Sequence, residues 1–156
     1  MKGQNTAFIG FTLIEVTLAM TVAAISLTAV FALLATGSQA NHTAAEETGA
    51  TEILTAVAND LRATPAASPT SIQFGILIPS NPVENVTSST LFFDRFGKSS
   101  PSMETGSRYR VTVNFLPTET GRFATLATLR LTWPAPADPS NANTSAVELF
   151  IALDRN

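Results

Sequence analysis

The sequence contains no cysteine, one histidine and few charged residues. Without cysteine the chain can form no disulfide and no zinc–thiolate site, and it can perform no thiol chemistry. Only 13% of the residues are charged, and the nine Lys and Arg are scattered along the chain, so no basic patch predicts binding to nucleic acid. Hydrophobic residues make up 45% of the chain, which is too apolar for a disordered protein and unusual for a wholly soluble one.

The few residues that could carry chemistry do not form a recognisable site. His42 has no cysteine and no second histidine to complete a metal site, and it lies in a polar stretch with no nucleophile motif to serve. Glu46 and Glu47 are adjacent, so on a helix they point about 100° apart and form a solvated face. Asp94 and Asp138 are single carboxylates in turn-rich segments, whereas calcium needs six to eight oxygen ligands. We therefore expect no enzyme activity, no metal and no cofactor.

Most of the apolar excess lies in one stretch, residues 11–35, "FTLIEVTLAMTVAAISLTAVFALLA". At about 1.5 Å per helical residue, this stretch is long enough to cross a hydrocarbon core of roughly 30 Å. Lys2 precedes it, and no further Lys or Arg follows until Arg62. The positive-inside rule therefore predicts a single-pass membrane protein with a cytoplasmic N-terminus.

A single acidic residue, Glu15, interrupts the apolar stretch. Placing a carboxylate at the centre of a membrane helix costs about 2.5–3.5 kcal/mol on insertion scales, and less near the end where Glu15 lies. The helix dipole returns only about 0.3–1 kcal/mol at an exposed site, which does not explain the choice of residue. Cleavage between Gly10 and Phe11 would create a positive α-amine four residues from Glu15, on the same or a neighbouring chain, as a natural partner.

The stretch "GFTLIEV", at the junction between a polar leader and an apolar helix, resembles the processing site of type IV prepilins and type II secretion pseudopilins. The resemblance implies that prepilin peptidase cuts after Gly10 and that Phe11 becomes the N-methylated N-terminus. It also implies that Glu15 acts in assembly by neutralising the N-terminal amine of a neighbouring subunit. Residues 1–10 are then the leader peptide.

Small and hydroxyl-bearing residues are frequent in the apolar stretch. Such residues let membrane helices approach closely and form hydrogen bonds across an interface, which favours lateral packing of many helices in a filament core. The alternative is that alanine and threonine simply tolerate lipid. The set comprises Thr12, Thr17, Ala19, Thr21, Ala23, Ala24, Ser26, Thr28 and Ala29, and Thr12 joins Glu15 as an expected assembly residue.

A second helical segment, residues 36–63, is more polar and predicts an amphipathic continuation of the same helix. Ile53, Leu54, Val57, Ala58 and Leu61 follow the i, i+3, i+4 spacing of one buried stripe. The other face carries Thr51, Glu52, Asn59, Asp60 and Arg62, and Pro65 should end the helix. Gly37 and Gly49 could bend or interrupt it.

Residues 71–156 predict an antiparallel β-sheet head. The segments 71–79, 89–94, 107–117, 123–134 and 146–154 alternate apolar and polar residues as half-buried strands do, with 117–122 as a hairpin link. In the clearest cases Tyr109, Val111, Val113 and Phe115 point inward, as do Leu129, Leu131 and Trp133, whereas Arg130 and Thr132 point outward. We expect an α+β fold in which a long helical stem packs against this sheet, as in pilins.

A narrower resemblance covers most of the mature chain. The runs "TLFFDRFG", "RYRVTVNFLP", "RLTWPAPADPSNA" and "SAVELFIALDRN" are similar to a group of pilin-like proteins labelled Verru_Chthon cassette protein B. This resemblance refines the family and implies no further mechanism.

The expected function is that of a structural subunit of a pilus-like or pseudopilus-like filament, with prepilin peptidase, other pilin-like subunits and the inner membrane as partners. The missing cysteine pair and calcium site favour a minor or accessory subunit. One alternative is a monomeric, membrane-tethered binding module. Another is a secreted protein cut within "ALLATGSQA", whose mature N-terminus would lie near residue 40.

Overall fold

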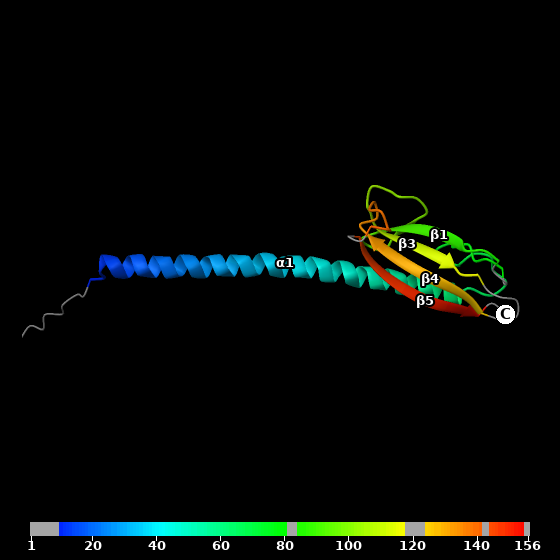
Figure 1. Ribbon diagram of the computed structural model, residues 1–156, viewed down its shortest axis with the longest axis horizontal. Helices are drawn as coiled ribbons and strands as arrows, with labels where there is room; N and C mark the ends of the chain where they lie inside the picture. Colours follow the sequence, from blue (N-terminus) through cyan, green and yellow to red (C-terminus); the bar gives the residue numbers. More distant parts are fainter. Residues whose placement is uncertain (1–9, 81–83, 118–123, 142–143, 155–156) are drawn as a thin grey trace, which may run out of the picture. The chain divides into compact units, whose positions relative to one another are not determined.

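The computed structural model describes residues 10–80, 84–117, 124–141 and 144–154. Within these residues, one α-helix, α1 (Leu13–Ala63), is followed by five strands, which confirms the α+β class (Figure 1). The chain divides into two compact units, Met1–Ala44 and Ala45–Asn156. The first unit holds the apolar part of α1, and the second holds the end of α1 and the whole sheet.

Helix α1 runs without interruption through Gly37 and Gly49, so neither glycine interrupts the expected continuous helix. A single glycine costs only about 1 kcal/mol relative to alanine, and its backbone still makes the helical hydrogen bonds. The helix ends at Ala63, two residues before Pro65, as expected from the restriction that proline places on the residues before it. The Thr64 hydroxyl donates to the Asp60 carbonyl oxygen at 2.7 Å and closes the last turn.

The predicted apolar stripe of the second helical segment is confirmed. Ile53, Leu54, Val57, Ala58 and Leu61 are all buried, and they share one core cluster with the inward residues of the sheet. The period of the sequence pattern was therefore sufficient to identify this face of α1.

Asp60 was assigned to the polar face of this segment, and that assignment is wrong. Its side chain is only 7% exposed, and its two carboxylate oxygens accept hydrogen bonds from the backbone N–H groups of Gln73 and Phe74, at 2.8 and 3.1 Å. A buried carboxylate needs such donors, because an unpaired one would be prohibitively costly. Asp60 thus fastens the segment that follows α1 onto the helix.

The sheet has the strand order β2-β1-β3-β4-β5, and every neighbouring pair is antiparallel. Figure 1 shows β1, β3, β4 and β5 in this order. The strands are β1 (Thr87–Asp94), β2 (Ser99–Ser100), β3 (Ser107–Phe115), β4 (Ala124–Trp133) and β5 (Ser145–Asp154). All the residues predicted to point inward from β3 and β4 are buried. The hairpin link predicted at 117–122 falls almost wholly outside the described residues.

The strand predicted at 71–79 is absent; these described residues form turns with one isolated bridge, between Thr70 and Leu77. Gly75 adopts a φ of 63°, and the chain folds back so that the N–H of Ser71 donates to the Ile76 carbonyl at 2.9 Å. Ile76 and Ile78 still enter the core, whereas Ile72 is exposed. Alternating apolar residues in a short run can therefore fill a core without pairing as a strand.

One outward-facing position of β4 is also buried, against expectation. Thr132 is 2% exposed because the segment after β4 folds back over the outer face of the sheet. The N–H of Ala135 donates to the Arg108 carbonyl at 2.9 Å, and the Arg130 guanidinium donates to the Pro139 carbonyl at 3.0 Å. Loop residues with no periodic pattern provide this cover, so the pattern of β4 alone could not predict it.

Gly49 marks a close approach between α1 and β3, and we predict that it tolerates no side chain. A Cβ atom at this position would lie 2.9 Å from the hydroxyl oxygen of Tyr109, which is 4% exposed and donates to the Glu46 carbonyl at 3.3 Å. We expect Gly49→Ala to lower the free energy of unfolding by about 1 kcal/mol despite the better helix propensity of alanine. Urea unfolding of the full chain in detergent, followed by Trp133 fluorescence, measures this change.

Tyr109→Phe provides the matched background for this prediction, because it removes the atom with which the new Cβ would collide. In that background Gly49→Ala should be neutral or stabilising. An equal loss of stability in both backgrounds would show that the contact with Tyr109 is not the cause.

Candidate functional site

The candidate site lies at the N-terminal end of α1, where Thr12 and Glu15 bond to each other in both directions. The N–H of Thr12 donates to Glu15 Oε2 at 3.1 Å, and the Thr12 hydroxyl donates to the same oxygen at 3.0 Å. In return the N–H of Glu15 donates to Thr12 Oγ1 at 3.3 Å. Since α1 begins at Leu13, Thr12 is the N-cap residue and Glu15 is the third helical residue.

This arrangement is a capping box, which satisfies two backbone N–H groups that a helix start otherwise leaves without partners. Glu15 therefore caps the start of α1, a role that was not predicted from the sequence. The signal was present, because Thr-x-x-Glu before an apolar run is the pattern that predicts a capping box. Glu15 is therefore useful to the chain before any processing, in addition to any role it has afterwards.

The proposed cleavage point directly precedes this capping box. Gly10 and Phe11 lie outside α1, and both are exposed. Residues 1–9 of the predicted leader, including Lys2, lie outside the described residues. The structure therefore brings Thr12 and Glu15 together and leaves Gly10 and Phe11 outside the helix.

The surface of α1 from residue 16 to residue 35 is almost entirely apolar. Among the described residues α1 is the one helix long and apolar enough to cross a membrane, which is compatible with the expected anchor. An apolar helix exposed on all sides is unsuited to water and needs lipid or other helices around it. Its exposed large hydrophobic residues are Leu13, Ile14, Val16, Leu18, Met20, Val22, Ile25, Leu27, Val30, Phe31, Leu33 and Leu34.

The hydroxyl groups in this part of α1 donate to the helix itself. Thr21, Ser26 and Thr28 each donate to the carbonyl four residues earlier, at 2.8, 2.8 and 2.9 Å. These bonds satisfy the hydroxyl protons without water, so the residues suit an apolar environment. Their oxygen atoms can still accept a hydrogen bond from a neighbouring helix.

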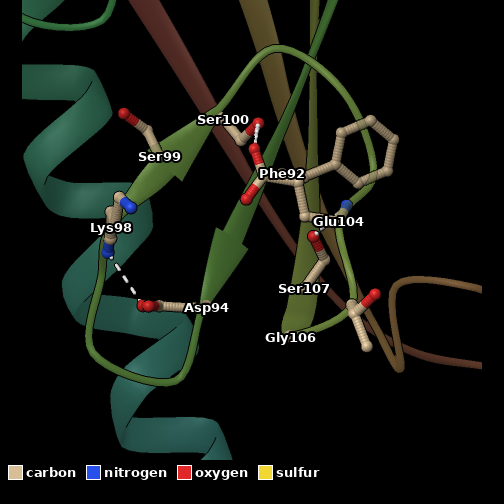
Figure 2. Close-up of a pocket in the computed structure, with 9 residues that line it drawn as sticks. Phe92, Asp94, Lys98, Ser99, Ser100, Glu104, Gly106 and Ser107 are labelled. Atoms are coloured by element: carbon tan, nitrogen blue, oxygen red, sulfur yellow. Dashed lines mark hydrogen bonds between the residues drawn. The ribbon is translucent and has the colours of Figure 1, made fainter.

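A second candidate, a polar cavity of about 500 Å³, lies between β1, β2 and the start of β3 (Figure 2). Its two carboxylates are used by the surrounding loops. Asp94 Oδ1 accepts the N–H groups of Phe96 and Lys98 at 2.8 and 2.9 Å, and Glu104 Oε1 accepts the Ser100 hydroxyl at 2.7 Å. These contacts are typical of turns that bond to themselves, so the cavity offers a ligand no carboxylate free of such bonds.

The remaining acidic candidates also have structural roles. Glu46 is half-buried and forms an ion pair with Arg108, so its assignment to a solvated face is wrong, whereas Glu47 is exposed. The N–H and hydroxyl groups of Ser140 donate to Asp138 and hold the pKa of that carboxyl below its usual value. The described residues contain no group of three or more His, Asp or Glu that could hold a metal ion. His42 is exposed on α1.

Fold and site together define an α+β protein in which an apolar N-terminal helix, started by a Thr12–Glu15 capping box, continues into a small antiparallel sheet unit. No protein-family model matches the chain, and comparisons with curated proteins and with solved structures find no match either.

Proposed function

We propose that this protein is a structural subunit of a type IV pilus-like or type II secretion pseudopilus-like filament, in a minor or accessory position. Prepilin peptidase would remove the leader after Gly10 and methylate Phe11, and the apolar half of α1 would then pass from the membrane into a filament core. The protein would act by assembly rather than by catalysis, with its sheet unit on the periplasmic side of the inner membrane.

The observation that carries this proposal is the position of Glu15. It is the only charged side chain between residues 11 and 35, and it lies in the first turn of α1, whose surface over this range is exposed and otherwise almost entirely apolar. The capping box occupies Glu15 Oε2, and no described group bonds to Oε1. A carboxylate held in this way can accept a further hydrogen bond from a positive amine, and a charge-assisted bond is about twice as strong as a neutral one.

The surface of α1 supports the same proposal. Apolar side chains exposed over the full circumference of a helix favour burial among several neighbours or in lipid. A subunit that exchanges a membrane for a filament core needs such a surface in both places.

Mass spectrometry of the mature N-terminus tests the proposal directly. We expect the chain isolated from membranes to begin with N-methylated Phe11, and we expect the chain to keep Gly10 when prepilin peptidase is absent. A mature chain that begins near Asn41 would instead identify a secreted protein and overturn the proposal. A chain that keeps residues 1–10 in the presence of the peptidase would favour a simple membrane tether.

A further inference from the structure

In the part of the chain that the structure describes, the two edges of the sheet have no paired strand over most of their length. Among the described residues no strand pairs with the outer edge of β5, and β2 pairs only with Phe92 and Phe93 at the end of β1. The stretch Thr87–Leu91 of β1 is therefore also without a strand on its outer side. Open edges expose rows of backbone N–H and C=O groups that can pair with another chain.

The edge at β5 lacks the features that usually prevent such pairing. The strand Ser145–Asp154 contains no proline, glycine or lysine, and Glu148 forms an ion pair with Arg130 of β4. Phe150 projects from the outer face of the strand and is 69% exposed. Natural edge strands are typically short or carry proline, lysine or a bulge, so this edge is unusually well suited to pairing.

We propose that residues 147–151 on the β5 edge of one subunit pair with Thr87–Leu91 of a neighbouring copy, so that the sheets of adjacent subunits join along this stretch. This inference deepens the proposed function and rests on it, because it needs copies that lie side by side.

Strand direction supports this pairing. Three antiparallel steps separate β1 from β5, through β3 and β4, so β1 and β5 run in opposite directions. When a copy is displaced sideways without reversal, its β1 therefore lies antiparallel to the β5 of the first copy. An antiparallel pair forms the more stable of the two kinds of ladder.

The register within the sheet defines which residues would meet. Across the sheet, Ser88 pairs with Asn114, Asn114 with Thr128, and Thr128 with Phe150. Ser88 and Phe150 are therefore the two ends of one row of paired residues. Sideways displacement brings these ends together at the junction between two copies. In this register the inward-facing residues of one copy lie beside the inward-facing residues of the next. A register shift of one residue would place inward-facing residues beside outward-facing ones.

The neighbouring row places compatible side chains at the junction. Thr90 and Glu148 are the ends of the row that runs through Thr112 and Arg130. The junction would therefore set the Thr90 hydroxyl, a donor, opposite a carboxylate, and Thr87–Leu91 carries no charge that could repel Glu148. Pairing of β5 with a second β5 would instead close after two copies, whereas pairing of two different edges can continue along an assembly.

Disulfide cross-linking tests the pairing, because the chain has no cysteine of its own. Full-length Ser88→Cys and Phe150→Cys chains are co-expressed and oxidised in membranes. Directly opposed residues of antiparallel strands lie about 4.5–5.5 Å apart at Cα, within disulfide range. We expect a mixed dimer at about ten times the level of the Ser88→Cys and Ala146→Cys control, and a ladder of multimers from the chain with both substitutions.

Ala146 is the matched control because it is exposed on the same face of β5 as Phe150. It lies four residues from Phe150, or about 13 Å along the strand, which is beyond disulfide range. Equal cross-linking of the two pairs would overturn the proposed register. Dimers from Phe150→Cys alone, at the level of the mixed pair, would overturn the pairing of different edges.

The same samples separate this inference from the proposed function. If the mature chain begins at methylated Phe11 and the mixed dimer is absent, the edge pairing is wrong and the filament proposal stands. If the mixed dimer forms and the chain is not cut after Gly10, the edges pair and the filament proposal is wrong.

Discussion

Replacement of Glu15 by glutamine is expected to abolish filament formation while the chain stays in the membrane. Glutamine at this position preserves the capping box, because it accepts the N–H of Thr12 as glutamate does, but it carries no charge. The amine of a neighbouring Phe11 would then be buried without a counter-charge, which costs about 3–5 kcal/mol. Association should weaken by roughly 100-fold or more, as measured by the amount of subunit in sheared, sedimented filaments.

Glu15→Val is the comparison that separates the two roles of the carboxylate. Valine removes both the charge and the two bonds that Glu15 Oε2 accepts from Thr12, and it lowers the cost of membrane insertion, so the chain should still fractionate with membranes. If the charge of Glu15 is what assembly requires, the glutamine and valine variants should lose filament formation to the same extent. Wild-type assembly by Glu15→Gln, together with failure of Glu15→Val, would show that Glu15 acts only as a helix cap.

The second large effect is expected from Asp60→Ala. This change removes the carboxylate that accepts the N–H groups of Gln73 and Phe74 in two part-buried bonds, and it releases the segment after α1. Each lost bond to a charged group is worth about 1.5–3 kcal/mol, so we expect a loss of about 3–5 kcal/mol in the free energy of unfolding. Urea unfolding of the full chain in detergent, followed by the fluorescence of buried Trp133, measures this loss.

Two variants serve as controls for Asp60. Asn59→Ala alters the exposed neighbour on the same turn and should change stability by less than about 0.5 kcal/mol. Asp60→Asn keeps one acceptor oxygen, so its free energy of unfolding should lie between those of the wild type and Asp60→Ala. A loss in Asp60→Ala no larger than that in Asn59→Ala would contradict the role assigned to the two backbone bonds.

The features that the sequence predicted well are those with a regular period. The buried stripe of α1 and the inward residues of β3 and β4 follow periods of 3.6 and 2, and the structure confirms both. The apolar stretch that contains Glu15 was recognisable from length and composition alone. Such patterns depend on local geometry, so they need no knowledge of distant partners.

The features that the sequence missed depend on contacts between segments far apart in the chain. Asp60 looked like a surface residue because its partners, Gln73 and Phe74, lie beyond the end of the helix. Glu46 similarly meets Arg108 from β3. The alternation at 71–79 predicted a strand, but Gly75 turns the chain before it can pair. Neither the hydrophobic period of a segment nor its secondary-structure propensity indicates which distant segment it will contact.

The same distinction applies to the candidate site. The pattern from Gly10 to Glu15 was readable as a processing motif, and the Thr-x-x-Glu pattern within it was equally readable as a helix cap. Processing, methylation and assembly remain predictions. The capping box shows that a residue expected to serve assembly also has a local structural role, so substitutions of Glu15 must be designed to separate the two.

The place where α1 begins has a consequence for how the leader could be removed. The hydrogen bonds that start the helix join Thr12 to Glu15 and Val16, and none of them uses Gly10 or Phe11. Hydrolysis of the peptide bond between Gly10 and Phe11 would therefore leave the conformation of the helix unchanged, because it would break none of these hydrogen bonds. Its effect would be electrostatic, since a new amine would add positive charge to a helix end that is already positive. Maturation would then act by changing the charge of a finished helix rather than its fold.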